Sequence, residues 1–275
     1  MKLGIIQGWD EAGFQYAASK GLYGVEFCVN ARYDTEEFSK QVPQIQSYIK
    51  KYGVVVGSMG RWGQTRIDEN GEIIESALQD DKRLIDAASA LGCPVYNVGC
   101  NWTEGKTFEE NCQIAIAYFA KLLAYAEGKN VKIATVNCDW VNFVLTPKEW
   151  SVIHTALPEL GIKYDPSHCL SRKGDYLKEM LDWCKRFYHF HIKGTLYIDG
   201  EHYDDPPAGL DEIHWGPVMN ILYTQGYDGM LSIEPHSSYW KGCMGQWGVD
   251  FSIRYIRSLL MPEDYGKDTA SPYMP

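Results

Sequence analysis

Residues 161–168 read GIKYDPSH and predict the end of a buried strand. A short apolar run leads to Asp165, Pro166 stops the strand, and His168 follows three residues after Asp165. A carboxylate and an imidazole are therefore expected at the C-terminal end of this strand. Parallel α/β proteins carry their chemistry at such strand ends, so the stretch predicts both a fold class and the place of a site.

Two later stretches repeat this arrangement. Residues 187–193, FYHFHIK, alternate so that His189 and His191 share one face of a strand, and residues 230–236, MLSIEPH, reach Glu234 just before a proline. Three successive strands thus offer candidate ligands at their ends: Asp165, His191 and Glu234.

Strand and helix patterns alternate eight times at spacings of roughly 30 residues, the size of one βαβ unit. The predicted strands are 2–7, 23–28, 54–58, 94–98, 131–136, 161–165, 187–193 and 230–234. The predicted helices are 10–20, 35–51, 72–91, 107–127, 146–160, 175–184, 217–225 and 249–260. This pattern predicts a single-domain (β/α)8 TIM barrel over residues 1–262. A doubly wound sheet shares the alternation, but the count of eight disfavours it.

Composition narrows the classes of partner. The formal net charge is −10, and Lys and Arg are scattered, so nucleic acid is disfavoured. Eight cysteines lie far apart without a CxxC spacing, which predicts reduced thiols in the cytoplasm. No run approaches the ~20 apolar residues of a membrane span.

The tail, residues 263–275, is predicted to extend onto a neighbouring subunit of a homo-oligomer, and residues 204–216 are predicted to form a lid or a subunit contact.

The three candidate ligands lie 26 and 43 residues apart, but a barrel brings all its strand ends to one rim. Two carboxylates and an imidazole suit Mn²⁺, Mg²⁺, Co²⁺ or Zn²⁺. Each residue alone has another explanation: Asp165 as a helix cap, His191 bonded to backbone in the core, Glu234 in a rim ion pair. Their occurrence at three successive strand ends favours a metal site.

The same residues carry a family resemblance. DPSH at 165–168, HFHIKG at 189–194 and LSIEPH at 231–236 resemble the sugar phosphate isomerase/epimerase group of xylose-isomerase-like barrels. That group includes ketose 3-epimerases, inosose dehydratases and, more distantly, endonuclease IV. The resemblance implies that Asp165, His191 and Glu234 bind a divalent metal, with Mn²⁺ preferred, and that His168 faces the substrate.

One position departs from that family. Its fifth strand normally ends in a Glu followed by Asn, and this Glu is a fourth ligand and an acid/base. Here residues 131–140 read VKIATVNCDW, which puts Val136 at that place. Asn137 or Asp139 are alternatives, but a shift of one residue turns a strand side chain to the other face. Asn142, farther along the loop, is predicted to bind a sugar hydroxyl.

Only Glu234 then remains of the family's two proton-transferring carboxylates. A single base can move a proton along one face of an enediol or start a β-elimination. We therefore predict a divalent-metal-dependent sugar or keto-sugar isomerase/epimerase-like enzyme that transfers a proton next to a carbonyl through a metal-stabilised enediolate. The alternatives are a lyase or dehydratase acting on a 3-keto sugar or glycoside, and a non-catalytic sugar-binding barrel.

Further residues are predicted to support catalysis or substrate binding. Glu26 is a second candidate acid, or a buried carboxylate paired with an arginine such as Arg61, itself a candidate substrate ligand. Lys193 is a candidate to neutralise an oxyanion, or pairs with Glu234. His236 is a candidate to orient substrate or donate a proton, or is a solvated loop residue. Trp102 offers an aromatic face for a sugar ring, or only packs.

Overall fold

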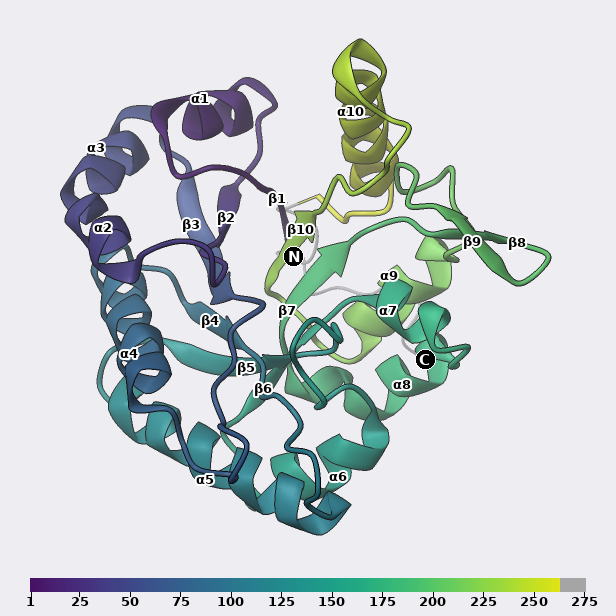
Figure 1. Ribbon diagram of the computed structural model, residues 1–275. Coiled ribbons are helices and arrows are strands. Elements are labelled where there is room, and N and C mark those ends of the chain that lie inside the picture. Colours follow the sequence, from purple (N-terminus) through teal and green to yellow (C-terminus); the bar gives the residue numbers. More distant parts are fainter. Residues whose placement is uncertain (263–275) are drawn as a thin grey trace, which may run out of the picture.

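The computed structural model describes residues 1–262 and contains a closed barrel of eight parallel strands (Figure 1). Around the barrel the order is β1-β10-β7-β6-β5-β4-β3-β2. The strands are β1 (Lys2–Ile6), β2 (Gly24–Cys28), β3 (Val55–Arg61), β4 (Val95–Val98), β5 (Lys132–Val136), β6 (Gly161–Tyr164), β7 (Phe187–Ile192) and β10 (Met230–Ile233). The predicted TIM barrel is confirmed.

Helices surround the barrel and follow the strands along the chain (Figure 1). They are α1 (Glu11–Ser19), α2 (Thr35–Lys40), α3 (Val42–Tyr52), α4 (Glu75–Ala90), α5 (Phe108–Ala126), α6 (Pro147–Ala156), α7 (Pro166–Ser171), α8 (Tyr176–Trp183), η1 (Cys184–Arg186), α9 (Trp215–Thr224) and α10 (Gly242–Ser258). Thr107 and Thr146 each begin a helix with a capping box. No helix within residues 1–262 is long and apolar enough to cross a membrane.

Several predicted segments differ from the structure: α7 lies where no helix is predicted, and α10 begins at Gly242 and not near residue 249. The single helix expected over 35–51 is two helices, α2 and α3, because Pro43 in the first turn of α3 has no N–H and its ring cannot follow a helical turn. The segment between the predicted strand 187–193 and the predicted helix 217–225, for which no element is predicted, contains a hairpin of β8 (Leu196–Ile198) and β9 (Glu201–Asp204). Asp199 and Gly200 both have positive φ, as an Asp-Gly hairpin turn requires.

The N-terminal end of the barrel is filled by one side chain, Met230. A Cβ added to Gly4, Gly24 or Gly57 would lie 2.4, 2.8 or 2.3 Å from the Met230 sulfur. These three glycines come from β1, β2 and β3, so the strands leave room for a methionine from β10. Met230 thus packs against three neighbouring strands at this end, and the candidate ligands lie at the opposite end of the barrel.

The middle of the barrel is unusually polar. Its fully buried side chains include Glu26, Ser58, Asn97, Lys163 and His189. Glu26 pairs in register with Ser58, and Lys163 with His189, so these residues lie at matching levels on neighbouring strands. Polar groups at this depth need partners, and they form the floor of the site described next. The predicted tail, 263–275, lies outside the described residues.

Candidate active site

Three strand ends meet at the open rim of the barrel. Asp165 follows β6, His191 lies near the end of β7, and Glu234 follows β10. Because β7 lies between β6 and β10, His191 is central: its Nδ1 is 2.8 Å from Glu234 Oε2 and 3.8 Å from Asp165 Oδ2. One ligand atom from each residue lies within 4.8 Å of the others. The structure thus gathers the three residues that the sequence singled out.

The two carboxylate oxygens of Asp165 have different surroundings. Oδ1 accepts hydrogen bonds from the Ser167 N–H (2.9 Å) and the Ser167 hydroxyl (2.7 Å), so it caps α7. Oδ2 is buried and has no hydrogen-bond partner among the described residues. The predicted alternative of a helix cap is therefore met by one oxygen, while the other faces His191. A buried carboxylate oxygen without a donor is costly unless a bound water, ion or ligand satisfies it.

Asn137 fixes the position of Asp165. Its Nδ2 donates to the Asp165 carbonyl (2.8 Å), and its Oδ1 accepts from the Asp165 N–H (3.0 Å). Asn137 is therefore occupied with main-chain bonds, and Asp139 is exposed to solvent. Neither replaces the family's glutamate, and Val136, only 2% exposed, occupies that place with a hydrocarbon.

Two buried lysines approach the same carboxylate oxygen. Lys163 Nζ and Lys193 Nζ each lie 3.9 Å from Asp165 Oδ2. Burial opposes the charged form of Asp165, but Lys193, His168 and Lys163 outweigh it, and the pKa of Asp165 is lowered. Burial likewise opposes the charge on Lys193, but Asp165 and Glu234 raise its pKa. Sequence reasoning missed Lys163, although alternation along the strand places it on the face of Asp165.

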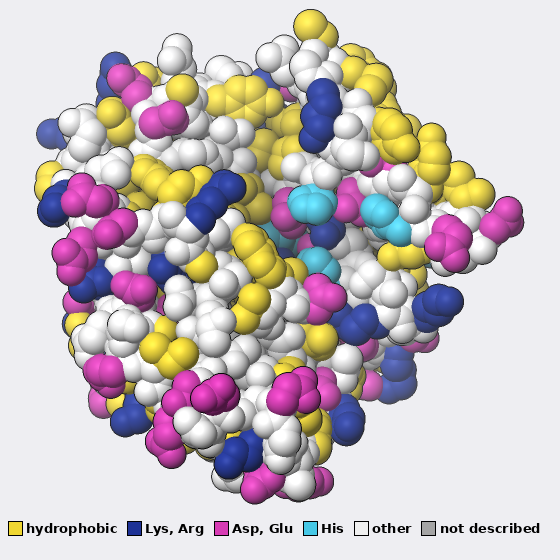
Figure 2. Space-filling view, in the orientation of Figure 1, with side chains coloured by type: hydrophobic (Ala, Val, Ile, Leu, Met, Phe, Trp, Pro, Cys, Tyr) yellow, Lys and Arg dark blue, Asp and Glu magenta, His cyan; other side chains and the backbone are white. Residues whose placement is uncertain are grey.

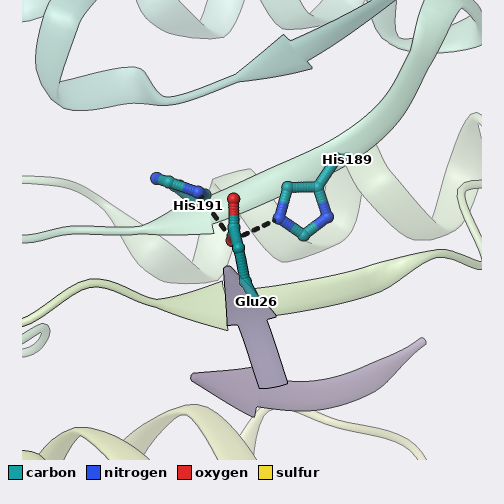
Figure 3. Close-up of side chains that lie close together, drawn as sticks. All are labelled: Glu26, His189 and His191. Carbon is teal, nitrogen blue, oxygen red and sulfur yellow. Dashed lines mark hydrogen bonds and ion pairs between the residues drawn. The ribbon is translucent and has the colours of Figure 1, made fainter. Parts of the chain in front are cut away.

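Glu26 lies beneath these groups and binds two histidines (Figure 3). Its Oε2 accepts from His189 Nε2 (2.7 Å) and from His191 Nε2 (2.9 Å). Burial opposes its charge, but the two histidines hold the pKa of Glu26 well below its usual range. Glu26 is therefore not paired with Arg61, and it contacts His191 from the side opposite to Glu234.

Both nitrogens of His191 thus face carboxylates, Nε2 toward Glu26 and Nδ1 toward Glu234. Since carboxylates only accept, the ring either carries both protons or offers Nδ1 to a cation. Burial disfavours the charged ring, but Glu26 and the hydrogen bonds to Glu234 and Glu26 raise the pKa of His191. Burial also opposes the charge of Glu234, but His191, Lys193 and Lys163 lower its pKa well below the usual range.

Two sets of side chains have the spacing of a metal site, and they share His191. Glu26, His189 and His191 form one, Asp165, His191 and Glu234 the other. In the first, Glu26 Oε2 already accepts two N–H groups and all three residues are buried. In the second, Asp165 Oδ2 accepts no hydrogen bond from the described residues. The Glu234 side chain is 22% exposed, which leaves access for a ligand. The second set fits a divalent cation, with Glu26 orienting the imidazole from behind.

His168 lies in α7 beside this set. Its Nε2 is 3.6 Å from Asp165 Oδ2, and its side chain is 19% exposed. Burial, together with Lys193 and Lys163, lowers the pKa of His168 to about 3 in spite of Asp165. The imidazole is neutral near pH 7 and able both to donate and to accept a hydrogen bond. Figure 2 shows histidine side chains gathered in a hollow between carboxylates.

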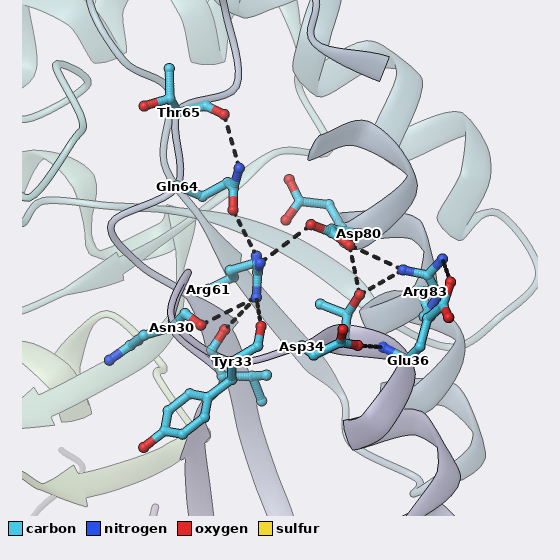
Figure 4. Close-up of polar contacts among 12 residues, drawn as sticks. Asn30, Tyr33, Asp34, Glu36, Arg61, Gln64, Thr65, Asp80 and Arg83 are labelled. Carbon is cyan, nitrogen blue, oxygen red and sulfur yellow. Dashed lines mark hydrogen bonds and ion pairs between the residues drawn. The ribbon is translucent and has the colours of Figure 1, made fainter. Parts of the chain in front are cut away.

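Two predicted substrate ligands have structural roles instead. The Arg61 guanidinium is buried and donates to the carbonyls of Val29, Asn30 and Tyr33, with Asp80 3.3 Å away (Figure 4). None of these partners belongs to the ligand set. Arg61 holds the loop after β2 against α4, and its predicted contact with substrate stays a prediction.

Asn142 is the second predicted substrate ligand that has a structural role. Its Nδ2 donates to the carbonyls of Val136 and Cys138, and its Oδ1 accepts from the N–H groups of Cys100 and Val144. All its hydrogen-bonding capacity is used by main chain, so the predicted sugar contact is corrected to a loop brace.

Trp102 and His236 remain accessible. Trp102 is 38% exposed and packs edge-on against Phe143, with centroids 5.5 Å apart. His236 Nδ1 lies 2.8 Å from Asp205 Oδ2, and His202 Nε2 lies 2.9 Å from Asp205 Oδ1. The hydrogen bond to Asp205 raises the pKa of His236. Asp205, which sequence reasoning missed, joins the hairpin loop to the end of β10.

Comparison with known proteins agrees with the architecture. The sequence pattern of a family described as xylose isomerase-like TIM barrel matches residues 14–258. A search of curated protein sequences finds no match.

Three solved structures illustrate the likeness. D-psicose 3-epimerase from Clostridium cellulolyticum H10 has a TM-score of 0.74 at 14% identity, covering 95% of this chain and 100% of that one. The 3-keto-D-glucoside 4-epimerase of E. coli has 0.73 at 16%, covering 94% and 99%. Mannonate dehydratase from Streptococcus suis serotype 2 has 0.72 at 13%, covering 94% and 93%. At these identities the likeness concerns the fold alone.

Proposed function

Because the chain belongs to the xylose isomerase-like TIM barrel family, we propose that it is a sugar isomerase or epimerase-like enzyme of carbohydrate metabolism that binds a divalent cation. Asp165, His191 and Glu234 are the proposed ligands, and Mn²⁺ is the proposed metal, with Mg²⁺, Co²⁺ and Zn²⁺ as alternatives. The observation that carries the proposal is the convergence of three ligand atoms within 4.8 Å, one of them a buried oxygen without a donor.

A divalent cation held there would supply Lewis-acid polarisation of a carbonyl and its neighbouring hydroxyl. Glu234 is the proposed base, because its carboxylate is ionised, reaches the rim and is more exposed than Asp165. His168, neutral and partly exposed, is the proposed hydrogen-bond partner of a substrate hydroxyl. Lys193 is cationic beside Asp165 and is the proposed partner of negative charge that develops on oxygen.

The substrate is proposed to be a neutral sugar or keto-sugar. This is supported by neighbours that act on sugars, among them an epimerase of a 3-keto-D-glucoside. The chemistry is proposed to use one base. Val136 cannot transfer a proton, and its register partner is a lysine, Lys163, and not a second carboxylate. One-sided proton transfer favours isomerisation over two-base epimerisation.

A lyase is the second candidate, and the same observation at Val136 supports it, because β-elimination from a 3-keto sugar or glycoside needs only one base. Product analysis separates the two. A 3-keto glycoside would release its aglycone or water with a lyase, while a free ketose in D₂O would gain deuterium next to its carbonyl with an isomerase.

Metal binding is the first experiment. Protein stripped with EDTA is titrated with Mn²⁺ by calorimetry, and Asp165→Asn is compared with Asp175→Asn. Asp175 is a matched control because it caps α8, accepting from the Lys178 N–H at 3.0 Å, as Asp165 caps α7. We expect one Mn²⁺ per chain, weakened at least tenfold by Asp165→Asn alone.

A protein that takes up no stoichiometric Mn²⁺, and whose thermal midpoint EDTA leaves unchanged, would instead be a sugar-binding barrel without catalysis. The predicted cytoplasmic location and homo-oligomeric state remain parts of the proposal. Light scattering after size-exclusion chromatography tests the latter.

A further inference from the structure

A cavity of about 580 Å³ opens beside Glu234. Its floor is formed by Ile192, Ile233 and Glu234, and its sides by α1 and α10, which flank the ends of β1 and β10 (Figure 1). Asp165, His168 and His191 are not among the described residues that line it. The space therefore adjoins the proposed base but lies beyond the ligand set.

An aromatic wall bounds the cavity. Trp240 lines it, and Gly248 on α10 lets the indole lie against the helix, because a Cβ at Gly248 would come within 2.9 Å of a ring carbon. On its other contact the Trp240 ring stacks on Trp247, with centroids 5.8 Å apart and planes at 20°. Trp247 thus covers one face of the Trp240 ring, and the remaining surface of the indole contributes apolar lining to the cavity.

The rest of the lining suits a neutral ring. Pro206, Pro207, Ala208 and Val249 add apolar surface, while Gln7, Gln246 and Ser237 add a few polar groups. The carboxylates among the lining residues are Asp10, Asp205 and Glu234, against the side chains of Lys241 and His236. This charge balance disfavours phosphate or another anion. A mostly apolar pocket with few polar groups is typical of small-molecule sites, which range over roughly 300–1,000 Å³.

We propose that this cavity is a second subsite, which holds a ring joined through a glycosidic bond to the sugar at the ligand set. The substrate is then a keto-glycoside, or a disaccharide whose reducing sugar lies at the ligand set, and not a free monosaccharide. The inference rests on the proposed function, because that function places the reacting sugar next to Glu234. The subsite is inferred because Glu234 forms part of the cavity floor. The apolar Trp240 side chain in its wall indicates that the occupant is a ring.

Binding of unreactive probes tests the proposal apart from turnover. Affinities for D-glucose, phenyl β-D-glucopyranoside and cellobiose are measured by calorimetry with and without Mn²⁺. We expect at least one two-ring probe to bind about tenfold more tightly than D-glucose, from stacking and apolar burial. Tighter binding of the phenyl glucoside identifies an aryl occupant, and tighter binding of cellobiose identifies a second sugar.

Two variants, Trp240→Ala and Ala12→Phe, and one control, Trp247→Ala, locate the effect. Trp240→Ala should remove most of the preference for two-ring probes, whereas Trp247→Ala, the other half of the stack, 50% exposed and outside the lining, should keep it. Ala12→Phe fills the cavity from an exposed position of α1 and should exclude the two-ring probes while D-glucose still binds. This second variant keeps the test valid if Trp240→Ala fails to fold.

Equal affinity for one-ring and two-ring probes, or a preference that survives both Trp240→Ala and Ala12→Phe, would overturn the subsite. Failure of the proposed function would give a different set of results. A protein that prefers glycosides but neither binds Mn²⁺ nor exchanges a substrate proton retains the subsite and loses the enzyme assignment. The reverse outcome retains the enzyme and removes the subsite.

Discussion

Replacing Glu26 with glutamine should weaken metal binding, although Glu26 is not itself a proposed ligand. Glu26 is fully buried, and its Oε2 accepts from His189 Nε2 at 2.7 Å and from His191 Nε2 at 2.9 Å. Glutamine is nearly isosteric and keeps one oxygen, but it removes the negative charge. The bond that fixes the orientation of the His191 ring is then neutral, and the ring is less basic at Nδ1.

The size of the effect follows from these two bonds. Hydrogen bonds to charged groups contribute about 1.5–3 kcal/mol each and are roughly twice as strong as neutral ones. If the two bonds lose half of their combined strength, the fold is destabilised by about 1.5–3 kcal/mol, or roughly 3–12 °C in the thermal midpoint. Loss of a carboxylate that orients a metal-binding histidine typically costs roughly 10–100-fold in metal affinity.

Two measurements and one control separate stability from orientation. Urea unfolding gives the free energy of unfolding, and calorimetric titration with Mn²⁺ gives affinity at a temperature where every variant is folded. Glu179→Gln is the control, since this partly buried carboxylate accepts from the Tyr164 hydroxyl at 2.9 Å, outside the ligand set. Should Glu26→Gln bind Mn²⁺ as tightly as the Glu179→Gln variant, the assignment of Glu26 as an orienting carboxylate is refuted.

Three other substitutions test the fold and the site. Asp81→Asn should cost about 3–5 kcal/mol in urea unfolding, because Asp81 accepts from buried Arg66 at 2.7 and 3.1 Å and the guanidinium would lose its counter-charge; a cost below 1 kcal/mol contradicts this. Burial lowers the pKa of His154 to about 4, so the unfolded chain binds the extra proton between about pH 6.5 and 4 and stability falls as pH falls through that window. His154→Gln should remove on the order of 3 kcal/mol of this loss when unfolding at pH 7 and pH 4 is compared, and identical pH profiles would speak against it. Val136→Glu should raise Mn²⁺ affinity at least tenfold by adding a carboxylate in register with Lys163, and unchanged affinity would mean that the carboxylate does not reach the ligand set.

The sequence alone determined the architecture, because that information is local. Alternation and helical periodicity repeat eight times, and turn residues such as Gly53, in the left-handed conformation at the end of α3, mark the ends of elements. The Asp-Gly pair at 199–200 is likewise a local hairpin signal in the sequence, and both residues have positive φ in the structure. Asp165, His191 and Glu234 could be grouped because barrel closure places all strand ends at one rim.

Only the tertiary structure decided what each polar side chain contacts. Glu26 binds His189 and His191 from 163 and 165 residues away, and no periodicity records which carboxylate reaches which imidazole across a barrel. Arg61 looks from the sequence like a candidate substrate ligand, but it binds main-chain carbonyls. Local patterns fix the face on which a side chain lies, whereas its hydrogen-bond partners depend on distances set by packing of the whole barrel.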